Sequence, residues 1–249
     1  MVSLRELVSY SDDLLRVREI EDKSLNGLQI SSDRDVKQAA FAVDASVESI
    51  ESASQADILF VHHGLFWGIP KPLTGSLYFR IRAAIKNGLA LYAAHLPLDA
   101  HPVLGNNAQL LKLLGLKQAG DFGRYESIPL GKIGTLEKAI PLSKFVSKIN
   151  SSLGTRSIVA HHGPTTVKRI GIISGDGSYA LEEVKRLGLD ALLTGETQHI
   201  AIPVAKELGL NIIFAGHYAT ETLGLKALAG HLKKKFKIST AFIDLPTGL

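Results

Sequence analysis

The sequence predicts an α/β fold made of two similar halves, with mixed sheets and helices on both faces. Short apolar runs alternate with amphipathic runs along the chain, several amphipathic runs end in glycine, and one order of elements occurs twice. Such alternation is typical of sheets that helices cover on both faces. The 249 residues, 45% hydrophobic and 21% charged, have the composition of a globular protein, which excludes disordered and fibrous classes.

Apolar runs mark the expected strands, which are 39–43, 58–61, 89–93, 170–174, 191–194, 212–215 and a closing strand at 242–244. Amphipathic runs mark the expected helices, which are 47–54, 77–86, 180–187, 200–208 and 222–235. Glycines at 88, 188 and 209 are the expected signal for the end of three of these helices. Asn106 or Asn107 is expected to cap a further helix after Gly105.

The repeated order suggests an internal duplication. In each copy a strand is followed by a helix, a buried strand, a second helix and a third strand. A histidine with a carboxylate four residues further on comes next, as His95 with Asp99 and as His217 with Glu221. The alternative is chance similarity of two βαβ units. We expect a first half at 1–123, a second half at 124–210, and a segment at 211–249 that returns His217 and Glu221 to a metal site.

The chain has no cysteine, so a metal ion must be held by histidine and carboxylate side chains. His62 and His63 directly follow the strand at 58–61. Adjacent side chains of a strand point to opposite faces. The two imidazoles therefore converge only if the chain turns, which Gly64 permits, or else each serves a different ion of a pair. Two surface histidines in a turn are the alternative.

Three further groups of polar residues follow expected strands, at 95–101, 216–221 and 194–199. Asp99 is a candidate metal ligand, with a helix cap or a turn residue as the alternative, and His95 is a candidate residue that orients a ligand. His217 and Glu221 are one helical turn apart, so they can face one centre, and Glu221 can bridge two ions.

The segment 194–199 occupies the place in the second copy that His62 and His63 hold in the first. Glu196 and His199 are candidates for acid–base catalysis or substrate contact, whereas Thr194 or Thr197 as a helix cap is the alternative. His161 begins a His-His-Gly sequence like that at His62, but it matches no position of the duplication, so we expect a turn there.

Taken together, these segments resemble the family of GTP cyclohydrolase 1 type 2 homologues, also called NIF-three-like or YbgI-like proteins. The resemblance covers nearly the whole chain and is carried by blocks in one order, namely 26–29, 62–68, 95–101, 105–107, 194–196, 216–221 and 242–244. It implies two similar α/β halves, a dinuclear metal centre and assembly as a ring-shaped homohexamer. It also implies metal ligands at His62, His63, Asp99, His217 and Glu221. Two divalent ions per chain are expected, and this donor set suits Zn, Fe, Mn or Ni.

The leading functional hypothesis is a dinuclear metal-dependent hydrolase that uses metal-activated water. Its substrate is expected to be a nucleotide, in GTP cyclohydrolase-like chemistry, or another phosphorylated small molecule. His95, Glu196 and His199 are the candidate catalytic residues, and no other cofactor-binding residues are expected. The alternatives are a protein that stores or delivers metal and a ring-shaped scaffold for nucleic acid. The net charge of +4 supports the scaffold only weakly because it is diffuse.

We expect a cytoplasmic protein without membrane contact, because the N-terminus has charges where a signal peptide needs an apolar core. The apolar stretch 65–70 is expected to pack against a neighbouring subunit, since aromatic residues are enriched in interfaces. The alternative is that Phe66 and Trp67 fold back into their own core.

Overall fold

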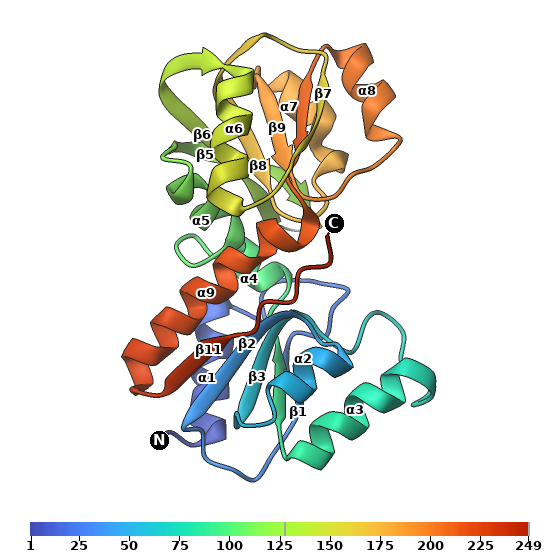
Figure 1. Cartoon of the computed structure of the whole chain (residues 1–249), viewed down its shortest axis with the longest axis vertical. Helices are drawn as coiled ribbons and strands as arrows, with labels where there is room; N and C mark the ends of the chain where they lie inside the picture. The colour runs from blue at the N-terminus through green and yellow to red at the C-terminus, as the bar shows by residue number, and fades with distance from the viewer. Residues whose placement is uncertain (127, 249) are drawn as a thin grey trace. The chain divides into compact units, whose positions relative to one another are not determined.

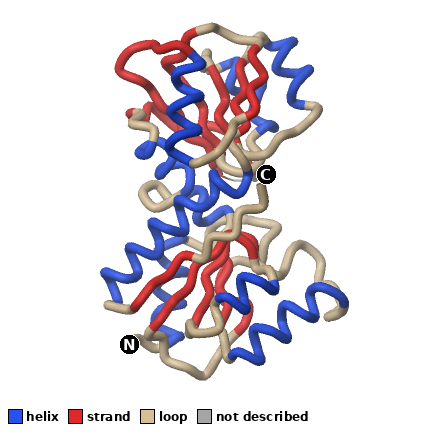
Figure 2. The backbone as a smooth tube through the Cα atoms, viewed as in Figure 1, coloured by secondary structure: helices blue, strands red, loops and turns tan. Residues whose placement is uncertain are grey.

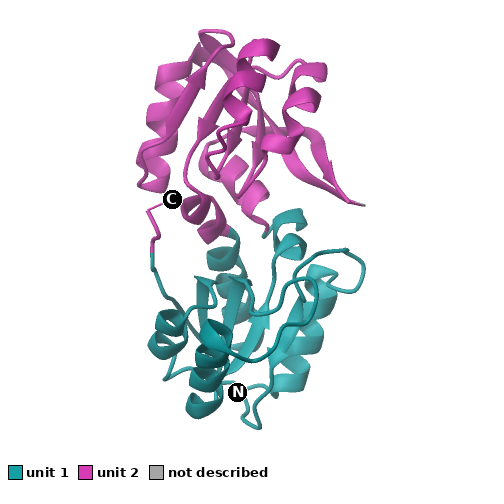
Figure 3. Ribbon diagram, turned by 90° about the vertical axis from the view of Figure 1, so that its right-hand side faces the viewer, with its two compact units in different colours: residues 1–104, 224–245 teal, residues 105–223, 246–249 magenta. Residues whose placement is uncertain are grey.

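The computed structural model describes residues 1–126 and 128–248, which form two compact units (Figure 3). Unit 1 contains residues 1–104 and 224–245, and unit 2 contains residues 105–223 and the residues from Pro246 onward. Helix α9 (His217–Phe236) has residues in both units. The division into segments 1–123, 124–210 and 211–249 concerns the duplication and stays a prediction. The compact units have other limits because strands distant in sequence pair within each of them.

The sheet of unit 1 has one antiparallel edge strand, and its other strands are parallel (Figure 1). Its order is β1 (Gly27–Ile30), β4 (Ala90–Ala93), β3 (Ile58–His63), β2 (Gln38–Asp44) and β11 (Ser239–Phe242). Because β3 and β4 are parallel neighbours, their carboxyl ends lie at the same edge of the sheet. The residues that follow these two strands are therefore brought together.

Helices cover both faces of this sheet. One face packs against α2 (Val47–Ser52) and α3 (Gly75–Asn87). On the other face the ring of Phe60 stacks on that of Phe41 and lies tilted against that of Tyr92. The Tyr92 hydroxyl donates to Asp12 of α1 (Leu4–Leu15) at 2.8 Å. Helix α4 (Leu96–Ala100) follows β4 directly.

The sheet of unit 2 is also mixed. Its order is β5 (Lys117–Tyr125), β6 (Ile128–Pro141), β8 (Thr166–Ile173), β9 (Ala191–Thr194), β10 (Asn211–Phe214) and β7 (Ile158–His161). Strands β8, β9 and β10 are parallel, and β7 is antiparallel to β10. This repeats the arrangement of unit 1, in which β1 is antiparallel to β4 beside the parallel strands β3 and β2.

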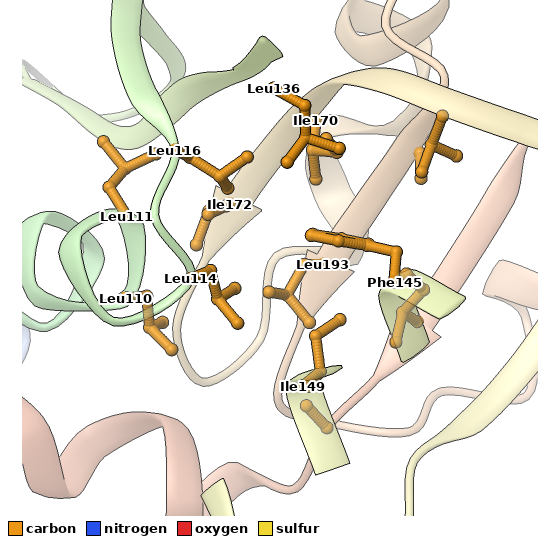
Figure 4. Close-up of a cluster of buried hydrophobic side chains, with 14 of the residues drawn as sticks. Leu110, Leu111, Leu114, Leu116, Leu136, Phe145, Ile149, Ile170, Ile172 and Leu193 are labelled. Atoms are coloured by element: carbon orange, nitrogen blue, oxygen red, sulfur yellow. The ribbon is translucent and has the colours of Figure 1, made fainter. Parts of the chain in front are cut away.

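The two faces of this second sheet carry different helices. Helices α5 (Asn106–Leu113) and α6 (Leu142–Leu153) cover one face, where Leu193 of β9 packs with Phe145 and Ile149 (Figure 4). Leu192, the preceding residue, points to the other face, which 3₁₀ helix η1 (Ser178–Ala180), α7 (Leu181–Arg186) and α8 (Ala201–Leu208) cover. In each unit helices flank the strands (Figure 2), which confirms the predicted fold class.

The hydrogen bonds at the start of the central strands also repeat. In unit 1 the carboxylate of Asp57 accepts from the backbone N–H groups of Lys37–Gln38 at 2.8 and 2.9 Å. In unit 2 the carboxylate of Asp190 accepts from those of Lys168–Arg169 at 2.7 and 2.8 Å. An aspartate before the second parallel strand thus ties down the first strand in each half. This shared detail supports two halves of similar construction.

The alignment of the two copies needs one correction. The N–H of Ala94 bonds the carbonyl of Val61, and the N–H of Ala215 bonds that of Thr194. Since Val61 and Thr194 end equivalent strands, the residue equivalent to His95 is Gly216, and His217 lies one position further. The expected pairing of His95 with His217 was wrong by one residue because the sequence contains no marker for strand register at that point.

The expected asparagine cap was also wrong. Gly105 is the N-cap of α5, and Asn106 and Asn107 are its first residues, both buried. The Asn107 amide instead donates to the carbonyl of Leu130 at 2.9 Å and accepts from the N–H of Ser174 at 2.7 Å. Among the described residues, no helix is both long and apolar enough to cross a membrane.

Candidate metal centre

Three imidazoles gather at the carboxyl edge of the unit 1 sheet. His62 and His63 end β3, and His95 follows the neighbouring strand β4. One ring nitrogen from each of the three lies within 4.8 Å of the others. The chain can approach β4 so closely after His63 because residue 64 is glycine, whose added Cβ would lie only 2.6 Å from the Cβ of Ala93. Position 64 therefore requires glycine because there is no space for a side chain, and not because of an unusual backbone angle.

His62 is fully buried and faces Asp99. Its Nδ1 lies 2.8 Å from the carbonyl oxygen of Ala94, and because a carbonyl only accepts, Nδ1 must carry the hydrogen. Its Nε2 lies 3.3 Å from Oδ2 of Asp99, which is 5% exposed. A lone pair and a carboxylate oxygen repel each other unless a proton or a metal cation lies between them. Asp99 lies in the first turn of α4, whose N-cap is His95, so the capping alternative was wrong.

The other two imidazoles of this cluster are oriented by carboxylates. Nδ1 of His63 lies 2.8 Å from Asp44, and Nδ1 of His95 lies 3.0 Å from Asp22. Histidines that bind metal through Nε2 are commonly held in this way through Nδ1, which fixes the tautomer and the ring orientation. The geometry therefore suits binding of a metal ion by Nε2 of all three rings, His95 included.

Asp22 is a site residue that the sequence analysis missed. Its side chain is 3% exposed and accepts from the N–H groups of Ser24 and Leu96 and from the Asn26 amide, in addition to contacting His95. Burial raises the pKa of Asp22, but its bonds to His95 and Asn26 outweigh burial and leave the pKa below its ordinary value. It lies in a loop before β1 with no motif around it, so the sequence carried no signal for it.

A second cluster lies in unit 2. His217 is the first residue of α9, and Glu221, 2% exposed, is one turn further on the same side. Nε2 of His217 lies 3.1 Å from Oε1 of Glu221, as the spacing in sequence predicted. Nδ1 of His217 lies 2.5 Å from Oε2 of Glu196. This ring is therefore oriented through Nδ1 in the same way as those of unit 1.

The two carboxylates keep a proton on His217 when no metal is present. Burial lowers the pKa of His217, but the hydrogen bonds and charges of Glu221 and Glu196 outweigh burial and raise it to about 9. A metal ion bound to Nε2 of His217 would replace this proton and would lie next to the Glu221 carboxylate. The donors of this cluster, one nitrogen and carboxylate oxygens, suit divalent transition metals.

Two glycines of unit 2 lie against this cluster. Gly175 has φ +60°, and a Cβ there would lie 2.5 Å from Oε1 of Glu221. A Cβ at Gly195 would lie 2.5 Å from Oγ1 of Thr220 and 2.9 Å from Cα of His217. Both positions need glycine because the start of α9 packs onto them directly.

His199 and Thr194 make none of the hydrogen bonds described for the two histidine clusters. His199 is exposed in the turn before α8, whose N-cap is Ile200. Thr194 does not cap that helix, because its hydroxyl donates to the carbonyl of Gly175 and accepts from the N–H of Gly177. Both threonine capping alternatives were therefore wrong.

Trp67 forms a wall of the unit 1 cluster. Its ring centroid is 4.8 Å from that of His95 and 6.0 Å from that of His63, and its Nε1 donates to the carbonyl of Gly64 at 2.8 Å. Trp67 is 36% exposed, whereas Leu65 is buried. The apolar stretch 65–70 thus folds partly back onto its own unit.

Comparison with known proteins gives one consistent family. Residues 2–247 match the model of the family described as Duf34/NIF3 (NGG1p interacting factor 3). The chain is 45% identical to a protein of Pyrococcus horikoshii named GTP cyclohydrolase 1 type 2 homolog, over 98% of both chains. It is 43% identical to a protein of the same name from Deinococcus radiodurans, over 98% of this chain and 94% of that one. A solved structure titled protein ybgI, unknown function, superposes with a TM-score of 0.94 at 35% identity and full coverage of both chains.

Proposed function

The chain belongs to the Duf34/NIF3 family, and we propose that it is a cytoplasmic, dinuclear metal-dependent hydrolase of a nucleotide or another phosphorylated small molecule. We further propose that His62, His63, Asp99, His217 and Glu221 hold the two ions. The names of the relatives support this reading, because opening a purine ring requires activated water. When bound, such ions lower the pKa of water and stabilise attacking and leaving oxygens.

One observation carries the proposal. Each of His62, His63, His95 and His217 has its Nδ1 bonded to an oxygen, so that Nε2 is the nitrogen each presents to a metal. In both units at least one of these Nε2 atoms faces a buried carboxylate, Asp99 or Glu221. Histidines placed to stabilise the fold alone have no reason to share this pattern.

The chain's own residues divide the remaining work. Asp44, Asp22 and Glu196 hold imidazole rings in place, and the buried Asp99 and Glu221 supply negative charge that offsets the charge of the ions. Trp67 shields one side of the unit 1 cluster from water. His199 stays the proposed residue for proton transfer or substrate contact. His95 and Glu196 were expected to share that role, but we propose instead that His95 adds a metal-binding nitrogen and that Glu196 orients the His217 ring.

Elemental analysis of purified protein tests the metal centre. We expect about two divalent ions per chain in the wild type and loss of both in Glu221→Ala, because we assign that carboxylate as the bridge. His161→Ala is the matched control, since His161 ends the edge strand β7, and it should keep the metal content unchanged. Full occupancy of both positions in Glu221→Ala would refute the bridging role.

A turnover screen separates the hydrolase from a metal-storage or metal-delivery protein. We expect the metal-loaded protein to convert a nucleotide or phosphoester while it keeps its ions. A delivery protein would instead release its ions to an acceptor chelator quickly and convert none of these compounds. That result would favour metal handling over catalysis.

We also propose that the chain assembles as a ring-shaped homohexamer, as the resemblance implies. Trp67 and Ile69, which is 84% exposed, are the apolar side chains of the 65–70 stretch that a neighbouring subunit would contact, so that assembly would also shape the mouth of the active site. Light scattering on the wild type and on Trp67→Asp tests this assembly. A monomeric wild type would end the ring proposal, and an assembled variant would end the role of this loop alone.

A further inference from the structure

A pocket of about 490 Å³ opens in unit 1 between two loops, residues 22–25 and 65–71, and is closed on one side by Leu77 of α3. Its volume is within the range of sites that take small molecules, about 300–1,000 Å³. The metal ligands assigned above are not among its lining residues. Its function must therefore be inferred from its own lining and from that lining's contacts with the cluster.

Backbone hydrogen bonds hold the two loops together. The N–H of Leu25 donates to the carbonyl of Phe66 at 3.0 Å, and the N–H of Gly68 donates to that of Lys23 at 2.7 Å. Ser24 and Trp67 pair as an isolated antiparallel bridge. The pocket thus exists before any ligand arrives, and binding need not order these loops.

The lining is apolar with a positive margin. Apolar side chains make up most of it, and its aromatic members are Phe66 and Trp67. Each loop contributes one exposed lysine, Lys23 from the first and Lys71 from the second. The single carboxylate of the lining is Asp22, whose charge is already engaged by His95, Asn26 and backbone N–H groups.

The pocket is joined to the candidate metal cluster by two of its own lining residues. The ring of Trp67 lines the pocket and lies 4.8 Å from the ring of His95. Asp22 lines the pocket and bonds Nδ1 of His95. A molecule in the pocket would therefore be separated from His95 of the cluster only by the side chains of Trp67 and Asp22.

We propose that this pocket binds the substrate, and that the substrate has a planar aromatic ring joined to an anionic group. The ring would lie on the apolar lining against Trp67, and the anion would lie toward Lys23 and Lys71. The inference rests on the proposed hydrolase function, since it makes the pocket the binding part of that site. A bare phosphate would leave the apolar lining uncovered, and a neutral apolar molecule would leave both lysines unused.

Binding to metal-free protein tests the pocket independently of catalysis. Trp67 is the only tryptophan of the chain, so the intrinsic tryptophan fluorescence reports on this wall alone. GMP, which has both a ring and a phosphate, should quench the fluorescence to saturation. Guanosine should quench it more weakly, and ribose 5-phosphate should leave it unchanged. Isothermal titration calorimetry with the same three compounds checks that the quenching reports binding.

Two lysine variants test the anionic part. Lys23→Gln and Lys71→Gln should each weaken GMP binding about three- to fivefold, as expected for an exposed charge pair, and leave guanosine binding unchanged. Lys206→Gln, which removes an exposed lysine of α8 in the other unit, is the matched control and should bind GMP as the wild type does. All three side chains are exposed, so the variants should fold.

The outcomes separate this inference from the proposed function. Absence of saturable quenching by GMP, or GMP binding that neither lysine variant weakens, would overturn the pocket assignment even if the loaded protein is a hydrolase. Saturable GMP binding that both variants weaken would support the pocket even if no turnover is found. Equal binding of GMP and guanosine would remove the anionic part of the proposal.

Discussion

Replacing Gly175 by alanine is expected to damage the unit 2 cluster without unfolding the protein. Gly175 has φ +60°, a conformation in which a Cβ costs about 1–2 kcal/mol. The new methyl group would also lie 2.5 Å from Oε1 of Glu221 and 3.5 Å from Nε2 of His217. Real Cβ atoms essentially never approach an oxygen so closely, so the Glu221 carboxylate must move.

Gly154→Ala is a matched control for this substitution. Gly154 also has a left-handed backbone, with φ +68°, but a Cβ there would meet no atom within 4 Å. The control therefore includes the backbone strain of about 1–2 kcal/mol and omits the collision with Glu221. The difference between the two variants isolates what the displaced carboxylate contributes.

Two measurements complete this test. Chemical denaturation of the metal-free proteins should show both variants less stable than the wild type, by about 1–2 kcal/mol for Gly154→Ala and by at least as much for Gly175→Ala. Competition with a chelating dye should show unchanged metal affinity in Gly154→Ala and affinity lower by about 10–100-fold in Gly175→Ala. Wild-type metal affinity in Gly175→Ala would refute the assignment of Glu221 as a ligand held by this packing.

Two further predictions concern the groups that orient the imidazoles. Asp22→Asn should lower metal affinity about 10–100-fold, because it removes the charge that orients His95. The control Asp13→Asn, at an exposed carboxylate, should leave metal affinity unchanged in the same dye competition. In metal-free protein the pKa of His217 is raised from an ordinary 6.5 to about 9. Its ion pairs therefore add about 3 kcal/mol to the free energy of unfolding below pH 6.5, and this contribution is lost as the pH rises through about 9. Denaturation at a series of pH values should show this loss in the wild type and a smaller one in Glu221→Gln. An equal loss in both proteins would contradict the assignment.

Strand positions could be predicted from the sequence because apolar runs and helix-ending glycines are local signals. Strand β3 was expected at 58–61 and is Ile58–His63, whereas the helix expected at 222–235 is α9, which begins earlier, at His217. The candidate ligands followed from position, since His62 and His63 end a buried strand and Asp99 lies in the short helix that follows the next one. The convergence of His62 and His63 with His95 then needed only the parallel order of β3 and β4.

The parts that could not be predicted depend on contacts between distant segments. Asp22 contacts His95 across 73 residues, and the fold rather than any local pattern brings them together. The correspondence of His95 with Gly216 depends on strand register. A difference of one residue in a loop changes the register, and the sequence pattern does not reveal it. The role of Gly175 likewise becomes visible only when α9 packs on it.

Glu196 provides a last test of how the two halves use one scaffold differently. The carbonyls of Val61 and Thr194 accept equivalent backbone hydrogen bonds, from Ala94 and Ala215, so these two residues correspond. Glu196, two residues after Thr194, therefore corresponds to His63. In unit 1 that place supplies an imidazole, whereas in unit 2 it supplies the carboxylate that bonds Nδ1 of His217 at 2.5 Å.

Glu196→Gln removes that charge and keeps the shape of the side chain. If Glu196 orients His217, metal affinity should fall about 10–100-fold, as it does when such partners are removed elsewhere. His199→Gln, which changes an exposed ring two residues before α8, should leave metal affinity unchanged and alter turnover alone. Unchanged metal affinity in Glu196→Gln together with lost turnover would instead assign Glu196 to proton transfer. The geometry favours the first result, because the Glu196 oxygen is already engaged by the ring that it would have to leave.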